Sequence, residues 1–210
     1  MGSRGMYESD SSKLKMIEPK DWTLAQTEEY LRGLDHEEAY AFDKDGKMIG
    51  GVEGGKTSVG IPKEWMQMEG ITVTHSHPTG ADGFGGTLSI NRHKDGSVSG
   101  DLPLFAKTKW KEMRATASGQ GEMNYIFRQN DNSRTQALVN VMKGRMNTLQ
   151  KNMRNVHKTI YEQELAKGRS KAAALKAARQ RSVGILDRQY KKTASKYGVD
   201  YITRKTPHKF

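Results

Sequence analysis

The chain has 210 residues, of which 35 are Lys or Arg and 24 are Asp or Glu, so its formal net charge is +11. It contains no cysteine, which excludes disulfide scaffolds, thiolate zinc fingers, iron–sulfur clusters and cysteine nucleophiles, and any metal ion must be held by His, Asp or Glu. No segment approaches the roughly 20 apolar residues that cross a bilayer, and the first residues lack the apolar core of a signal peptide, so we expect a cytoplasmic protein.

The charge divides the chain into two unlike parts. Residues 1–130 hold 16 basic and 19 acidic residues, a net charge of −3, whereas residues 131–210 hold 19 basic and 5 acidic residues, a net charge of +14. The change falls in the polar run 129–133, which is typical of a linker. We therefore expect an N-terminal segment over 1–35, a folded domain over 36–130 and a basic region beyond it.

The N-terminal segment predicts little regular structure before one short helix. Residues 1–20 are rich in Ser, Lys, Glu and Asp, and we expect them to be mobile. A helix should follow over 21–33, with Thr23 or Asp21 as its N-cap and Gly33 at its end.

The apolar pattern then changes from helical to period two. Strands over 38–42 and 48–52, joined by a short polar turn that contains glycine, predict a hairpin. A short helix over 62–68 begins at a proline, which favours a first helical turn. The β-branched run 71–75 predicts a further strand.

The rest of the domain predicts one more hairpin, a helix and a final strand. The hairpin joins 87–90 to 97–99, the helix covers 102–114, and the strand covers 124–128. Together these elements predict an α+β fold with one small mixed β-sheet and packed helices.

The basic region predicts two helices that form an antiparallel hairpin with basic outer faces. The run 168–170 interrupts the helical pattern and offers Ser170 as an N-cap, and a weaker apolar face follows from Leu175 to Tyr190. In the first helix, apolar residues recur at spacings of 4, 4, 3, 4, 3 and 4: Leu138, Met142, Met146, Leu149, Met153, Val156 and Ile160.

The tetrapeptide His75-Ser76-His77-Pro78 is the strongest chemical signal in the sequence. Alternate residues of a strand point to one face, so the two imidazoles can converge on one metal ion. A catalytic zinc takes three protein ligands and leaves a fourth position to water. We expect Asp101, which follows a flexible loop, to be the third ligand, with Asp82 as the alternative.

Two adjacent acids at the start of the first hairpin strand are candidates for a general base. Alternation places Glu37 with Ala39, and Glu38 with Tyr40 and Phe42. One of the two carboxylates must therefore share a face with the buried aromatic rings, where it is costly unless it has a role. The pattern alone does not choose between them.

The order of these motifs resembles the JAMM (MPN+, or JAB-domain) metallohydrolase superfamily, most of all its RadC-like and bacteriophage-associated branch. The resemblance covers about residues 36–130. It implies that His75, His77 and Asp101 bind Zn²⁺ and that Glu37 activates water. The motifs that carry it are Glu37-x-Ala39-x-x-x-Asp43-x-Asp45-Gly46-Lys47, Thr74-His75-Ser76-His77-Pro78, Gly85-Gly86-Thr87-Leu88-Ser89 and Asp101.

The resemblance also implies a serine that stabilises the developing oxyanion. The family usually has Ser-x-x-Asp, but Ser99 is separated from Asp101 by one residue, and Ser89 is separated from it by the predicted hairpin, so either serine can be the match. Glu37 would take a proton from water and pass it to the leaving amine. This chemistry predicts a zinc-dependent peptide or isopeptide hydrolase in the cytoplasm, which is the host cytoplasm for a phage protein.

The basic region has two interpretations. It packs on the domain or on a second copy of the chain, or it contacts nucleic acid or an acidic protein through a stripe of cations. Alternative functions are a nucleic-acid-binding or phage structural protein with a degenerate JAMM-like domain, and a toxin-type hydrolase. The candidate contact residues include Arg145, Lys151, Arg154, Lys158, Arg179, Arg181 and Arg188.

Overall fold

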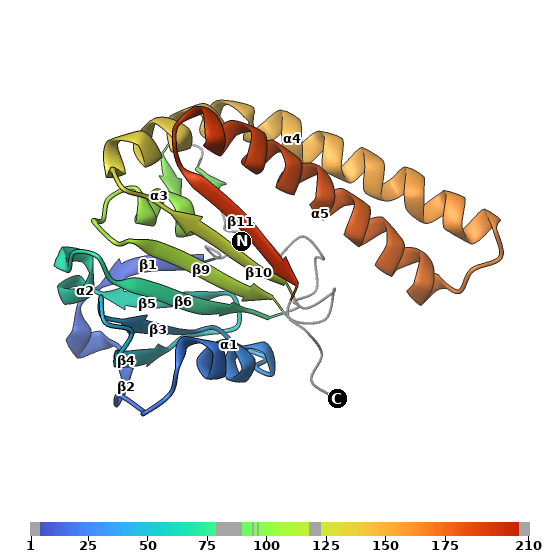
Figure 1. Ribbon diagram of the computed structural model, residues 1–210. Helices are drawn as coiled ribbons and strands as arrows, with labels where there is room; N and C mark the ends of the chain where they lie inside the picture. Colours follow the sequence, from blue (N-terminus) through green and yellow to red (C-terminus); the bar gives the residue numbers. More distant parts are fainter. Residues whose placement is uncertain (1–4, 79–89, 94, 96, 118–122, 206–210) are drawn as a thin grey trace.

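A computed structural model describes residues 5–78, 90–93, 95, 97–117 and 123–205. A mixed β-sheet forms the body, helices pack on it, and a long helical hairpin extends from one side (Figure 1). The predicted α+β class is confirmed.

The main sheet has seven strands, and the strand that carries the two histidines lies at its centre. The strands are β2 (Lys15–Ile17), β3 (Glu38–Phe42), β4 (Met48–Glu53), β6 (Thr72–His77), β9 (Glu112–Ala117), β10 (Met123–Arg128) and β11 (Asp200–Lys205). Their order is β11-β10-β9-β6-β3-β4-β2. The central β6 runs antiparallel to β3 and parallel to β9.

Two smaller sheets flank this body. The first pairs β1 (Gly5–Ser9) with β5 (Ser58–Pro62) in parallel, and the second pairs β7 (Asn91–Arg92) with β8 (Val98–Ser99) antiparallel. The short helical turn η1 covers Ser11–Lys13. Strand β8 lies within the predicted strand 97–99, but its partner β7 covers Asn91–Arg92, which the prediction placed in the turn, and residues 87–89 lie outside the described part of the chain.

The hairpin β3–β4 forms because its sequence alternates and its turn is polar. All five side chains of β3 are buried, since both faces of the sheet are covered. The Asp43 carboxylate accepts hydrogen bonds of 2.9 Å from the N–H groups of Asp45 and Lys47, and Gly46 takes a positive φ of 83°, a backbone conformation that favours glycine.

Helix α1 (Leu24–Arg32) packs on one face of the sheet against β3, β6 and β9. Thr23 is its N-cap and forms a capping box with Gln26, which satisfies two backbone N–H groups at the helix start. Leu31 contributes to a buried cluster with Tyr40 and other side chains of this face. The predicted helix is confirmed, and its N-cap is Thr23 and not the alternative Asp21.

The other face is covered by the larger apolar core. Helix α3 (Asp101–Phe105) and the root of α4 (Asn132–Ala166) pack there, and α2 (Lys63–Gln67) forms the predicted short helix after a proline. This core includes Val73, Ala115 and Phe127 of the central strands.

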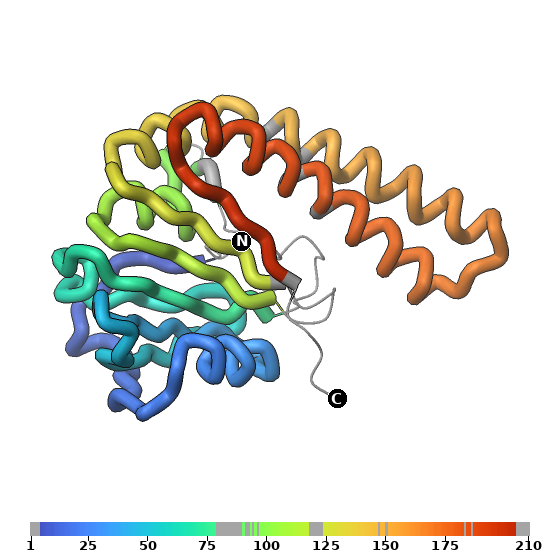
Figure 2. The backbone as a smooth tube through the Cα atoms, viewed as in Figure 1, coloured from blue at the N-terminus to red at the C-terminus, as the bar shows by residue number. Residues whose placement is uncertain are grey.

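Helix α4 and helix α5 (Lys171–Lys196) form the predicted antiparallel hairpin, whose path can be followed in Figure 2. Ser170 caps α5 by accepting the Ala173 N–H at 3.3 Å. Of the predicted apolar face on α4, Val156 is half-buried and the other members are buried. Within the described residues, no helix is both long and apolar enough to span a bilayer.

The prediction of one helix over 102–114 is wrong. Helix α3 ends at Phe105, and β9 begins at Glu112. The buried Trp110 fixes the connection by donating its indole N–H to the Trp65 carbonyl at 2.7 Å. In β9 the polar residues Glu112, Arg114 and Thr116 alternate with Met113, Ala115 and Ala117, a period-two pattern that is typical of a strand and not of a helix.

The expectation of a mobile segment over 1–20 is also wrong for its described part. Strand β1 pairs with β5 and buries Met6, and β2 pairs with β4 at the sheet edge. Short strands of this kind have no periodic signal of their own, and their pairing is decided by contacts with distant residues.

The basic region does not end in a helix. After Gly198, which has a φ of 64°, the chain returns to the sheet as β11 and pairs antiparallel with β10. The Tyr201 ring packs 4.7 Å from Phe127 and 5.6 Å from Tyr190, measured between ring centroids. These three rings join the root of the hairpin to the sheet.

Candidate metal centre

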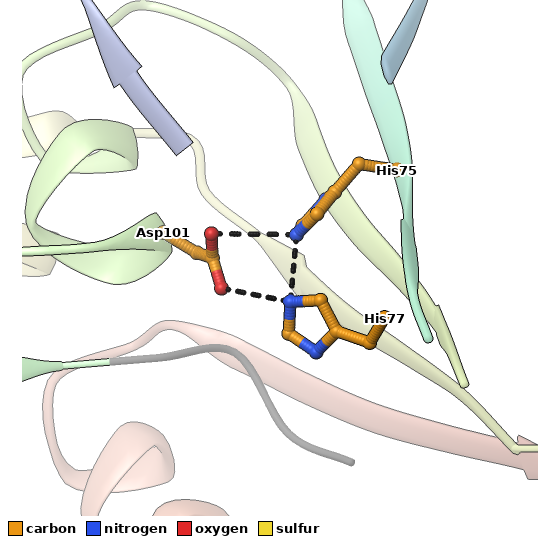
Figure 3. Close-up of side chains that lie close together, drawn as sticks. All are labelled: His75, His77 and Asp101. Carbon is orange, nitrogen blue, oxygen red and sulfur yellow. Dashed lines mark hydrogen bonds and ion pairs between the residues drawn. The ribbon is translucent and has the colours of Figure 1, made fainter. Parts of the chain in front are cut away.

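The two histidines lie side by side on the central strand and face the main core. Register places Ala39 of β3 and Ala115 of β9 on either side of His75. His75 and His77 are both buried, and their small neighbours leave room for the imidazole rings. The alternation expected for residues i and i+2 of a strand is therefore observed (Figure 3).

Asp101 reaches these rings from a distant part of the chain. It is the first residue of α3 and follows Gly100, whose φ of 107° lies in a region that favours glycine. The Asp101 side chain is fully buried, and its Oδ1 accepts the backbone N–H of Met6 at 2.8 Å. The first described strand thus helps to hold the acid.

The three side chains present their ligand atoms to one point. The Nε2 atoms of His75 and His77 are 2.9 Å apart, and each lies near one carboxylate oxygen of Asp101, at 3.3 Å and 3.2 Å respectively. Zinc–nitrogen and zinc–oxygen bonds of about 2.0–2.2 Å place tetrahedral ligands roughly 3.3 Å apart. The two nitrogen–oxygen separations are close to this spacing, although they involve different oxygens of Asp101, and the two Nε2 atoms lie nearer to each other, so the group could hold a metal ion.

The backbone fixes the tautomer of His75. Its Nδ1 lies 2.8 Å from the Arg114 carbonyl oxygen, which can only accept, so Nδ1 carries the proton and Nε2 keeps its lone pair. A hydrogen bond of this kind on the second ring nitrogen is typical of metal-binding histidines.

The charges also suit a cation. Burial lowers the pKa of His75, which favours the neutral imidazole. Burial alone would raise the pKa of Asp101, but the adjacent imidazoles, when they are protonated at low pH, hold the pKa of this carboxyl well below its usual range. At neutral pH the group therefore combines a neutral imidazole on His75 with a carboxylate on Asp101.

Glu37 lies on the same face of the sheet as the two histidines. Its N–H donates to Gly55 at 2.8 Å and its carbonyl accepts from Gly54 at 2.7 Å, so the extended ladder continues one residue before β3. Ala39 pairs with His75, and alternation along the extended backbone puts Glu37 on the same face of the sheet as Ala39. Glu37 is buried.

Glu38 faces the opposite side. Its carboxylate accepts from Tyr40 at 2.8 Å and from Tyr30 at 3.3 Å, and it lies 3.1 Å from the His36 ring. This cluster belongs to the face covered by α1. Of the two adjacent acids, only Glu37 therefore shares a face with His75.

Ser76 ties the histidine strand to both neighbours of Glu37. Its hydroxyl accepts the Glu38 N–H at 2.8 Å and donates to the His36 carbonyl at 2.9 Å. Ser76 is buried, and it lies between His75 and His77 in the sequence. Its two hydrogen bonds hold the backbone on both sides of Glu37.

Ser76→Ala is expected to lower the free energy of unfolding by about 1–3 kcal/mol, because it leaves a buried N–H and a buried carbonyl without their partner. Urea unfolding followed by circular dichroism measures the change. Ser76→Thr keeps the hydroxyl and should lose less stability. Equal stability of Ser76→Ala and wild type would contradict the role given to this hydroxyl.

Of the two serine candidates, the described part of the chain contains Ser99. Ser99 lies on β8, with its hydroxyl 2.8 Å from the exposed His93 ring. Ser89 and the alternative ligand Asp82 lie outside the described residues. The choice between the serines therefore remains a prediction.

The candidate phosphate-contacting cations lie on the helical hairpin. Arg179 is half-buried, and the other six are exposed: Arg145, Lys151, Arg154, Lys158, Arg181 and Arg188. Two backbone groups that support the metal centre were not predicted from the sequence. They are the N–H of Met6 and the carbonyl of Arg114. A backbone N–H or carbonyl group gives no residue-specific signal in a sequence. Ser76, in contrast, is a side chain that lies inside the histidine motif.

Comparisons of the chain with protein-family models, with curated proteins and with solved structures found no match.

Proposed function

We propose that the chain is a zinc-dependent peptide or isopeptide hydrolase. The observation that carries this proposal is the buried triple of His75, His77 and Asp101, whose ligand atoms lie close enough together to hold one metal ion. Three protein ligands leave one coordination position, which is typical of catalytic rather than structural zinc. The donor set of two nitrogens and a carboxylate also suits zinc better than the all-oxygen sites of calcium and magnesium.

Zinc held here would supply Lewis acidity and lower the pKa of a coordinated water to about 7. Glu37 would act as the general base, because it is buried and the alternation from Ala39, which pairs with His75, puts it on the histidine face of the sheet. It would accept the proton of the attacking water and donate it to the leaving amine. Ser89 or Ser99 would donate a hydrogen bond to the oxyanion.

Glu37→Gln is expected to reduce hydrolysis at least about 100-fold, since loss of a general acid–base group typically costs 10²–10⁴-fold. The assay uses a mixed-sequence fluorogenic peptide library and a peptide linked through a lysine side-chain amide. Bound zinc is measured in parallel, and the variant should keep it.

Glu38→Gln is the matched control, because it makes the same change on the opposite face of the sheet. It should retain most of the activity and all of the zinc. Equal losses in the two variants would contradict the assignment of Glu37. A wild-type chain that binds no zinc and cleaves neither substrate would favour the alternative of a nucleic-acid-binding protein with a degenerate domain.

A further inference from the structure

The helical hairpin is much longer than its attachment to the sheet requires. Helix α4 has 35 residues and so spans about 52 Å at 1.5 Å per residue. Its root packs near α3, and its far half extends past the sheet together with α5 (Figure 1). In this far half Met153, Ile160 and Ala174 are buried, and Val156, Leu165 and Leu175 are half-buried, so the two helices of the projecting arm pack against each other along an apolar seam.

The arm is strongly positive and its few acids cannot neutralise it. Residues 132–196 hold 16 Lys or Arg and 3 Asp or Glu, a net charge of +13. Glu164 is buried and pairs with Lys167 at 2.9 Å and with Arg169 at 3.0 Å, and Glu162 lies 3.9 Å from Lys158. The basic character is therefore not used up in holding the two helices together.

Exposed cations form a row along one side of each helix of the arm. On α4, exposed cations stand at spacings of 3 and 4, opposite the buried seam, and on α5 a second exposed row has spacings of 7 and 4, so each row follows one side of its helix. The α4 row is Lys151, Arg154 and Lys158, and the α5 row is Arg181, Arg188 and Lys192.

The described side chains of the arm include no large exposed apolar or aromatic residue, and this limits the kinds of partner that fit the two rows. The large exposed apolar residues of the described chain are Tyr7, Met16, Tyr30 and Met68, all in its first half. Protein interfaces concentrate their energy in aromatic and apolar anchors, a helix on a membrane inserts an apolar face, and single-stranded nucleic acid stacks its bases on aromatic rings. A nucleic-acid duplex requires neither an apolar nor an aromatic surface, because positive charge alone attracts its phosphate backbone.

We infer that the projecting arm of α4 and α5 binds the sugar–phosphate backbone of double-stranded nucleic acid, without reading its sequence. The two rows of cations contact phosphates, and the buried seam keeps the arm rigid enough to present them. This surface is separate from the candidate metal centre, and the inference does not depend on the proposed hydrolase activity.

Fluorescence anisotropy of the full chain with a labelled 25-base-pair DNA duplex of arbitrary sequence tests this inference. Binding should weaken linearly on a plot of log affinity against log salt between 50 and 200 mM. The triple variant Lys151→Ala, Arg154→Ala and Lys158→Ala should bind at least about tenfold more weakly at 100 mM salt. Its salt slope should be shallower by about 2.7, because each phosphate contact contributes about 0.9. The corresponding variant at Arg181, Arg188 and Lys192 should behave alike.

The matched control removes the same number of exposed charges from the sheet body: Lys44→Ala, Lys56→Ala and Lys107→Ala. This control should bind the duplex as wild type does. Absence of binding at 50 mM salt, or equal weakening in the control, would overturn the inference. So would equal or tighter binding to poly-glutamate, to phosphatidylserine vesicles or to a single strand of the same length.

Discussion

Replacing His77 or Asp101 by alanine is expected to weaken zinc binding by more than about 100-fold. Each change removes a direct ligand, and changes to residues that only orient ligands already cost 10–100-fold. The wild-type chain should bind about one zinc ion per molecule, because the three ligand atoms lie within 4.8 Å of one another. Competition of the protein with a chromophoric chelator measures the affinity, and mass spectrometry of metal content gives the stoichiometry.

His93→Ala is the matched control for this experiment, since His93 is an exposed histidine on the connection that leads to Asp101. It should bind zinc as tightly as wild type. If Asp101→Ala also binds zinc normally while Asp82→Ala does not, the third ligand has been misassigned. Unchanged affinity in His77→Ala would contradict the site as a whole.

Glu28→Ala is expected to lower the free energy of unfolding by about 3–5 kcal/mol, the usual cost of leaving a buried charge without its partner. Glu28 lies on α1, where its carboxylate pairs with the Arg114 guanidinium and accepts the Asn124 amide at 2.6 Å. Arg114 also donates to Glu112 at 2.9 Å. All four side chains are buried, so they join α1 to β9 and β10.

Glu112, the second carboxylate beside Arg114, is held in its charged form by its ion pairs. Burial alone would raise the pKa of Glu112, but its ion pairs with Arg128 and Arg114 hold that pKa below its ordinary value. Loss of Glu28 therefore leaves the buried Arg114 cation with one carboxylate, which it shares with Arg128. Chemical denaturation of wild type and variant at pH 7 measures the loss.

Glu29→Ala provides the comparison for Glu28→Ala. Glu29 is the next residue of the same helix, but it is exposed and pairs with Arg32 at 2.5 Å. A surface ion pair of this kind contributes about 0–1 kcal/mol. Equal stabilities of the two variants would show that the buried network does not stabilise the fold.

Much of the fold follows from local sequence signals. The N-cap at Thr23, which was one of two predicted caps, the turn at Gly46 and the apolar face of α4 are each decided by residues close in sequence, and the structure contains all three. The elements that were missed depend on distant pairing. Strand β11 joins the sheet only after a helical hairpin of more than 60 residues, and β1 has β5 as its partner.

The candidate site shows the same division. The spacing of His75 and His77 predicts that they share a face, and the structure places Asp101 beside them. Glu37 could not be separated from Glu38 by alternation alone, because both faces of β3 are buried. The pairing of Ala39 with His75 supplies the missing information, since it sets the side of the sheet on which each acid lies.

The central claim is that His75, His77 and Asp101 bind one metal ion together, and a crystal structure of the zinc-loaded chain with anomalous data at the zinc edge tests it most directly. The account predicts a single strong peak about 2.0–2.2 Å from both Nε2 atoms and from an Asp101 carboxylate oxygen. A peak elsewhere, or imidazole rings turned away from each other with no peak between them, would contradict it.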